Sequence, residues 1–163
     1  MEDLRKSVND LVSEPSGGYI SIIRMQMVRE HGCLYGKERL RDMGTAAVIA
    51  RQLFVKADRE MMAVMSVSSS MEPLAVEVVS IGGLDYCNVD MRNIFKHAIL
   101  SNAGNIICLH NHPSGSAVPS KEDRMITEKI REAGKILDIR MLDHIIIGNE
   151  SYYSFHAGNV FDF

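Results

Sequence analysis

Two histidines and one aspartate stand at a spacing that could hold a metal ion. His110 and His112 are two residues apart, and Asp123 follows the second histidine by eleven residues. The apolar run 106–109 in front of His110 contains β-branched residues and predicts a buried strand. Side chains at i and i+2 of a strand point to the same face, so both imidazoles would meet at the strand's end. Two nitrogens and one oxygen, with a position left for water, are typical ligands of a catalytic zinc ion.

The residues after the histidines indicate how the aspartate could return to them. Pro113 ends the strand, and Ser114-Gly115 begin a loop. A structural alternative fits the same stretch, because Ser120 and Asp123 match the capping box at the start of a helix. A His-x-His pair at a strand end can equally be a pair of polar surface residues. The spacing alone leaves both interpretations open.

A longer set of residues resembles a known family. It consists of His110-Asn111-His112-Pro113-Ser114-Gly115, Pro119-Ser120-x-x-Asp123, Leu142-Asp143-His144-Ile145-Ile146-Ile147-Gly148 and Tyr153-Ser154-Phe155. From about Leu40 to Phe155 the sequence is similar to the RadC-like branch of the JAMM/MPN metalloprotease superfamily. The superfamily signature, His-x-His followed by seven residues, Ser, two residues and Asp, is present without a gap. Asn111, in the middle of the first motif, is usual for the RadC branch, whereas deubiquitinating members carry Ser or Thr there.

This resemblance implies a fold, a cofactor and a reaction. The implied fold is a single layered α/β domain of the MPN/JAB type, with a mixed β-sheet flanked by helices, similar to the cytidine-deaminase-like architecture. The implied cofactor is a zinc ion held by His110, His112 and Asp123. Ser120 would donate a hydrogen bond to the developing oxyanion. The implied reaction is hydrolysis of an amide bond by a metal-activated water, so we expect a metallopeptidase or isopeptidase whose partner is a peptide or protein substrate.

The transfer of protons during such a reaction requires a carboxylate beside the metal. From the residues alone, Glu60, Glu72 and Glu77 all qualify, because each lies on or beside a predicted strand. The resemblance favours Glu60, since the RadC branch carries an acidic residue just ahead of the first of two consecutive strands, which corresponds here to the predicted strand 61–67. Asp143-His144 is a further feature of that branch, and two roles stay open for it: orienting a ligand imidazole, or forming a hydrogen-bonded part of the core.

Composition predicts a globular protein of the cytoplasm. Of the 163 residues, 46% are hydrophobic and 24% are charged, which is ordinary for one compact domain. The sequence contains no apolar run of membrane-spanning length and no signal-peptide core at its start. Its three cysteines include no Cys-x-x-Cys pair, which favours free thiols in a reducing compartment. The net charge of −3 argues against a broad nucleic-acid-binding surface.

Two alternatives to a hydrolase remain. One is a nucleic-acid-associated module, as the DNA-repair label attached to RadC suggests. Longer RadC proteins carry a helix-hairpin-helix region, and nothing similar is visible before Leu40, so the chain is expected to be a short form. The other alternative is a domain that binds the metal without catalysis and serves as an interaction scaffold.

Apolar periodicity and turn residues predict helices that alternate with strands. We expect residues 1–18 to form a helical extension and a joint, and residues 19–163 to form the metallohydrolase domain. The predicted strands are 19–28, 61–67, 74–81, 106–109 with the histidines at its end, 142–147 and 152–155. The predicted helices are 37–54, one that is capped by Asp90 and buries a face within 91–99, and 120–137, whose apolar stripe runs from Ile126 to Leu137.

Overall fold

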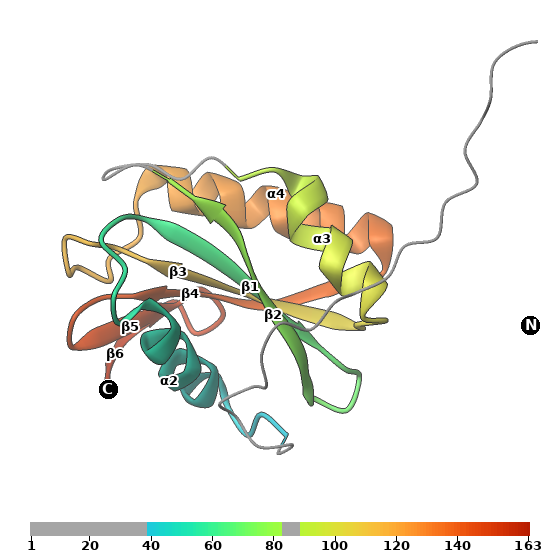
Figure 1. Cartoon of the computed structure of the whole chain (residues 1–163), viewed down its shortest axis with the longest axis horizontal. Coiled ribbons are helices and arrows are strands. Elements are labelled where there is room, and N and C mark those ends of the chain that lie inside the picture. The colour runs from blue at the N-terminus through green and yellow to red at the C-terminus, as the bar shows by residue number, and fades with distance from the viewer. Residues whose placement is uncertain (1–38, 83–88) are drawn as a thin grey trace, which may run out of the picture.

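Six strands form one mixed sheet with helices packed on both of its faces (Figure 1). The computed structural model describes residues 39–82 and 89–163. The predicted extension and joint of residues 1–18 and the predicted strand 19–28 lie outside this described part. The sheet has the strand order β2-β1-β3-β4-β5-β6. The layered α/β domain predicted from the sequence is therefore confirmed, and it is consistent with an MPN/JAB-like fold.

The helices and strands have the following bounds. The helices are α2 (Met43–Phe54), α3 (Met91–Leu100) and α4 (Lys121–Leu137). The strands are β1 (Met61–Val67), β2 (Pro73–Ile81), β3 (Asn105–Asn111), β4 (Arg140–Ile147), β5 (Ser151–Ser154) and β6 (Asn159–Asp162).

The strand directions bring three segments to one edge of the sheet. β1 pairs antiparallel with β3, so the first residue of β1, Met61, lies opposite the last residue of β3, Asn111. β3 pairs parallel with β4, and helix α4 makes the connection between them. A crossover helix must begin near the end of the first strand in order to return to the start of the second. The entry of β1, the end of β3 and the first turn of α4 are therefore neighbours.

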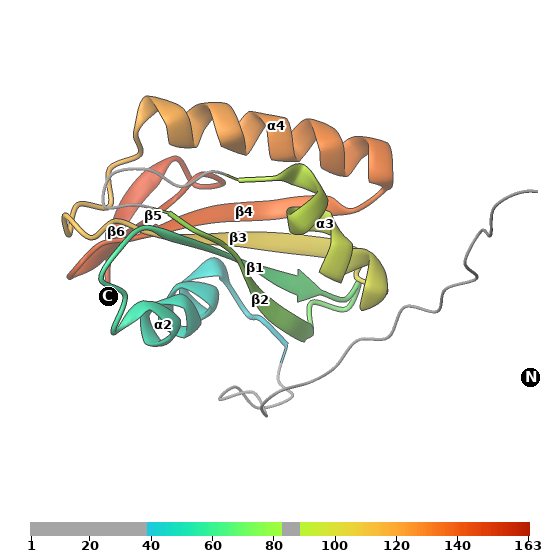
Figure 2. The same ribbon diagram turned by 45° about the horizontal axis from the view of Figure 1, so that its top comes forward.

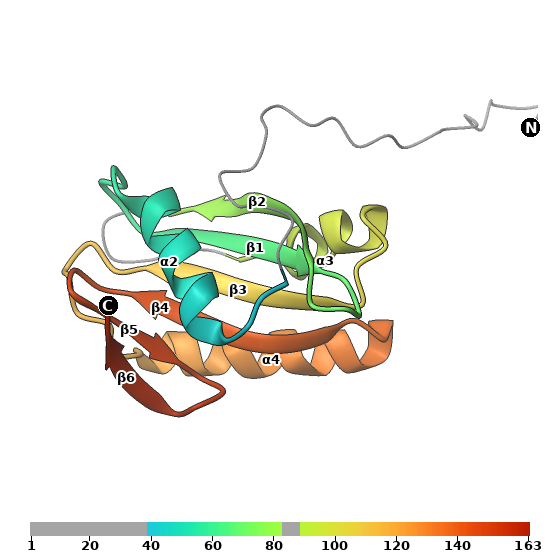
Figure 3. The same cartoon turned by 90° about the horizontal axis from the view of Figure 1, so that it is seen from below.

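The sheet separates two apolar cores. Helices α3 and α4 cover one face and α2 covers the other, as Figure 2 shows. Side chains from β3 alternate between the two cores: Ile106 and Cys108 pack toward α3 and α4, whereas Ile107 and Leu109 pack toward α2. α2 contributes three alanines that are fully buried, Ala46, Ala47 and Ala50, and their small side chains let the helix lie close to the strands (Figure 3).

The structure corrects one helix boundary and adds one strand. α2 begins at Met43 rather than at residue 37, because the Asp42 side chain caps it by accepting a hydrogen bond of 2.8 Å from the Thr45 N–H. β6 was not predicted, because its four residues are all exposed and carry no apolar alternation. β6 pairs with β5 and is the edge strand on that side of the sheet.

The predicted apolar faces are confirmed only in part. Ile130 of α4 is fully buried, but Leu137 at the end of the same predicted stripe is 43% exposed. On α3, Ile94 is fully buried while Ile99 is 52% exposed. Within residues 39–82 and 89–163, no helix combines the length and apolar character that crossing a lipid bilayer requires.

Candidate metal centre

The two histidines lie at the end of β3, as the sequence predicted. His110 faces α3 and α4, has the same side-chain direction as Cys108, and is 3% exposed. His112 follows the last residue of the strand, and its backbone N–H donates to the Ile147 carbonyl at 3.0 Å. This bond holds His112 beside the end of β4. The two imidazole rings meet edge to face, with their centroids 4.9 Å apart.

Asp123 approaches both rings from the first turn of α4. Its Oδ1 lies 3.0 Å from His110 Nδ1, and its Oδ2 lies 3.3 Å from His112 Nε2. Asp123 is 4% exposed, so this carboxylate is nearly removed from solvent. The loop after Pro113 thus brings the aspartate back to the histidines, and the three predicted ligands lie together.

The capping box at the start of α4 is also present. Asp123 N–H donates to Ser120 Oγ at 3.0 Å, and Asp123 Oδ2 accepts from the Ser120 backbone N–H at 2.7 Å and from its hydroxyl at 2.5 Å. The structural alternative and the ligand-like arrangement therefore hold for the same residues. The Ser120 hydroxyl is engaged with Asp123, so a bond from it to a substrate oxygen requires the hydroxyl to turn.

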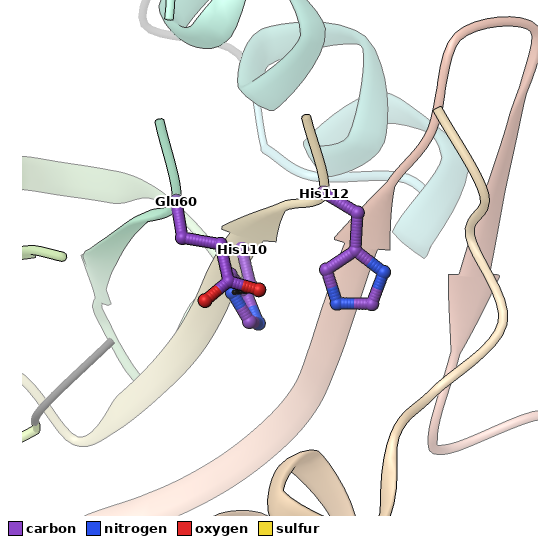
Figure 4. A group of neighbouring side chains, drawn as sticks. All are labelled: Glu60, His110 and His112. Carbon is purple, nitrogen blue, oxygen red and sulfur yellow. Dashed lines mark ion pairs between the residues drawn. The ribbon is translucent and has the colours of Figure 1, made fainter. Parts of the chain in front are cut away.

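Glu60 is the carboxylate nearest to the histidines among the three that the sequence left open. Its Oε1 lies 3.7 Å from His110 Nε2, and its side chain is 15% exposed. Figure 4 shows Glu60 and both histidines projecting in the same direction, and each offers a ligand atom within 4.8 Å of the others. Glu77 is exposed in the middle of the edge strand β2, opposite Val64, and Glu72 pairs with Arg39.

The environment of His110 fits a bound cation. Both ring nitrogens are buried, and neither has a hydrogen-bond partner of good geometry within the described residues. The Asp123 oxygen is close to Nδ1 but lies outside the direction in which a ring N–H would donate. Buried polar atoms in folded proteins are nearly always satisfied, so these nitrogens indicate a missing partner. Two imidazoles and a carboxylate are ligands suited to zinc.

The charges of the group are consistent with this arrangement. Burial opposes ionisation of Asp123, but contacts with His110 and His112 and the hydrogen bond from Ser120 outweigh it and hold the pKa of the carboxyl well below its usual range. Burial likewise disfavours a charged His112, but its bonds to Asp123 and to the Ser116 carbonyl raise the pKa of the ring. Asp123 is therefore ionised, as a metal ligand must be.

Asp143 and His144 form a buried layer behind the ligands, and both are fully buried. Asp143 accepts hydrogen bonds from the backbone N–H groups of His144 and His156 and from the Ser154 hydroxyl, at 2.5 to 2.8 Å. It thereby ties β4 to β5. Burial raises the pKa of this carboxyl in spite of the three donors.

The His144 ring stacks on His110 at a centroid distance of 5.9 Å and on Phe155 at 5.0 Å. Its Nδ1 lies 2.7 Å from the Thr127 hydroxyl, which donates its proton to the Asp123 carbonyl at 2.5 Å. The Thr127 oxygen must then accept from His144, so the proton of the ring is on Nδ1. Thr127 is a residue of the site that the sequence did not reveal, because a threonine inside a helix carries no distinguishing pattern.

A groove of about 270 Å³ adjoins His112 on the α2 side of the sheet. Its floor contains the buried side chains of Phe54 and Ile147, and Arg51 is the charged residue in its lining. The other lining residues come from the segment after α2, from the end of β3 and the loop that follows it, and from the turn after β4: Val55, Ala57, Asn111, Pro113, Gly148 and Asn149.

Comparison with known proteins places the chain in a family. Residues 40–160 match the family described as the RadC-like JAB domain. A UPF0758 protein of Thermotoga maritima is 31% identical over 154 residues, which cover 91% of this chain and 69% of that protein. A UPF0758 protein of Methanosarcina acetivorans is 53% identical over 81 residues, 50% of this chain and 35% of that protein, and one of Desulfitobacterium hafniense is 44% identical over 97 residues, 60% of this chain and 43% of that protein. The matched regions thus span only part of the length of these relatives. The chain belongs to the RadC-like JAB domain family.

Proposed function

We propose that this chain is a zinc-dependent hydrolase of amide bonds that acts on a peptide or isopeptide. The observation that carries the proposal is the convergence of His110, His112 and Asp123, with the carboxylate 3.0 and 3.3 Å from ring nitrogens. Ligands bound at about 2 Å around a tetrahedral ion are separated by about 3.3 Å. The two contacts use different oxygens of the carboxylate, and the ligand atoms that lie within 4.8 Å of one another belong to Glu60, His110 and His112. Side-chain rotation is therefore needed before one ion can contact His110, His112 and Asp123 together.

Asp123 is a better third ligand than Glu60. Glu60 also groups with the histidines, but its oxygen lies 3.7 Å from His110, farther than either Asp123 contact. Asp123 is held by the helix start, whereas Glu60 lies in the turn that leads into β1. This difference supports Asp123 as the third ligand, with Glu60 beside the ion.

Each of these residues has a separate role in the proposed reaction. A zinc ion supplies a water whose pKa is lowered to about 7 and polarises the carbonyl of the amide. Glu60 would accept a proton from the attacking water as the water oxygen bonds to the carbonyl carbon, and would return a proton to the leaving nitrogen as the C–N bond breaks. The products are a carboxylic acid and an amine. Ser120, once its hydroxyl turns from Asp123, donates to the carbonyl oxygen, and the groove beside His112 receives the substrate chain.

The experiment measures zinc content and amide hydrolysis in purified protein. We expect His112→Ala to lose stoichiometric zinc, while His156→Ala, which changes an exposed histidine, retains it. Glu60→Gln should retain zinc and lower hydrolysis of a peptide and isopeptide library by about 10²- to 10⁴-fold. Full zinc retention in His112→Ala would refute the ligand assignment. Wild-type protein that binds one zinc ion and cleaves no amide would instead refute the hydrolase and favour an interaction scaffold.

A further inference from the structure

The side chain of Asn111 holds the backbone on both sides of Glu60. Its Oδ1 accepts a hydrogen bond of 2.8 Å from the backbone N–H of Met61. Its Nδ2 donates a hydrogen bond of 3.1 Å to the backbone carbonyl of Arg59. The two bonded groups belong to the residues immediately before and after Glu60. One amide side chain therefore spans the residue that we assign to proton transfer.

These bonds extend the pairing of two strands beyond the end of the ladder. Met61 and Asn111 are register partners and are the first residue of β1 and the last residue of β3. Beyond them the strands stop, and the Asn111 amide continues the pattern of one donor and one acceptor that a backbone peptide group would present. The carbonyl of Glu60 is itself bonded on the opposite side, from the Gly82 N–H at 2.8 Å.

The residues preceding Glu60 do not supply an equivalent attachment. The guanidinium of Arg59 binds the neighbouring carboxylate of Asp58 through two contacts of 2.7 Å. Both side chains are exposed, 49% and 73% respectively, and their pairing is local to the turn. Asn111, by contrast, is 6% exposed and belongs to the strand that carries His110. It connects the turn directly to the ligand strand.

We infer that Asn111 is a positioning residue that fixes the distance between the Glu60 carboxylate and the metal ligands. This inference rests on the role of Glu60 in the proposed function. An amide is the suitable group, because Arg59 offers a carbonyl and Met61 offers an N–H, and Asn presents a donor and an acceptor together. A carboxylate has no proton for the carbonyl, and a shorter hydroxyl cannot span the two groups. A displacement of about 1 Å in a catalytic group can lower a rate by about 10²-fold.

Asn105 at the other end of β3 provides a matched control. Its Nδ2 donates to the Ser68 carbonyl at 3.1 Å, so Asn105→Ala also removes an amide bond to the backbone from the same strand. We expect Asn111→Ala to lower the turnover rate about 10²-fold with zinc content unchanged, and Asn105→Ala to leave both unchanged. In the Glu60→Gln background, Asn111→Ala should have no further effect on turnover, because its influence passes through the carboxylate.

A second measurement does not depend on activity. In the metal-free protein, amide hydrogen exchange at Met61 should be at least about tenfold faster in Asn111→Ala than in Asn105→Ala, because its acceptor is removed. Unchanged exchange at Met61, or multiplicative losses of turnover in the double variant with Glu60→Gln, would overturn the inference. Loss of zinc in Asn111→Ala would also overturn it, by showing that Asn111 supports the ligand strand instead. If wild-type protein hydrolyses nothing, the proposed function fails, and the exchange measurement still decides whether Asn111 holds the turn.

Discussion

Replacement of Thr127 by valine tests whether the polar layer behind the candidate ligands stabilises the fold. The Thr127 hydroxyl links the Asp123 carbonyl, at 2.5 Å, to the His144 ring, at 2.7 Å. Thr127 is 2% exposed and His144 is fully buried. Valine has nearly the same shape, so Thr127→Val removes the hydroxyl without opening a cavity. It leaves the Nδ1–H of His144 buried with no acceptor at that position.

The expected loss of stability follows from that unsatisfied donor. Leaving one buried donor unpaired costs about 1–3 kcal/mol, and the change in helix propensity from threonine to valine is small. The free energy of unfolding should therefore fall by about 1–3 kcal/mol, which corresponds to an increase of about 5- to 150-fold in the unfolding equilibrium constant. The Asp123 carbonyl contributes little to this loss, since it lies in the helix and can accept a backbone N–H.

Urea denaturation of the metal-free protein measures this loss. Thr45→Val is the control, because the Thr45 hydroxyl also bonds within one helical turn, to Asp42 at 3.0 Å, but in an exposed setting. We expect the control to change the free energy of unfolding by no more than about 0.5 kcal/mol. If the free energy of unfolding falls equally in both variants, then the bond to His144 does not stabilise the fold and the reasoning about the buried layer is wrong.

Two further predictions concern protonation and close packing. Burial lowers the pKa of His144 from 6.5 to about 3, so NMR of the metal-free protein should show a neutral ring at pH 5, and a titration midpoint between pH 5.5 and 7 would contradict this. The pKa of His144 is lower in the folded than in the unfolded chain, so the neutral ring contributes its full stabilisation above pH 6.5. As the pH falls toward 3, the free energy of unfolding should decrease by up to about 1.4 kcal/mol per pH unit. Gly148→Ala would place a methyl carbon 2.5 Å from the Gly115 carbonyl oxygen and 2.9 Å from the Ala117 nitrogen. Urea denaturation should therefore show that the free energy of unfolding falls by about 1–3 kcal/mol. An unchanged midpoint would show that the two loops can separate freely.

Local patterns in the sequence predicted the elements that carry the histidines and the aspartate. The apolar run before His110 and the turn residues after it located the end of β3. The helix 120–137 was predicted within one residue of α4, because Ser120 and Asp123 form the capping box that the sequence pattern indicated. The start of α2 was missed, because a helix begins where a cap forms, and several residues near position 42 had helix-forming character. β6 was missed because its pairing with β5 at the sheet edge requires no buried face.

The choice among the carboxylates required information that spacing does not contain. Glu60 directly precedes β1 and Glu77 lies within β2. Only the strand register shows that Glu60 lies at the same end of the sheet as the histidines. The sequence did not reveal the contacts of Asn111 and Thr127 either. The partners of Asn111 are 50 or more residues away along the chain, and His144 is 17 residues away from Thr127. Two roles were left open for Asp143 and His144, and the structure shows the hydrogen-bonded core role, since both are buried and Asp143 bonds Ser154 and His156. The orienting role stays a prediction: His144 stacks on His110, and its Nδ1 bonds Thr127 instead of a ligand imidazole.

The position of Asp123 in a helix cap has an energetic consequence for ligand binding. Two hydrogen bonds from Ser120 fix the rotamer of this carboxylate as part of the folded chain, independently of any ion. Immobilising a free side chain upon association usually costs about 0.5–1.5 kcal/mol. For Asp123 this entropy is already lost when α4 forms, so the helix start preorganises one ligand, and a cation gains correspondingly in affinity.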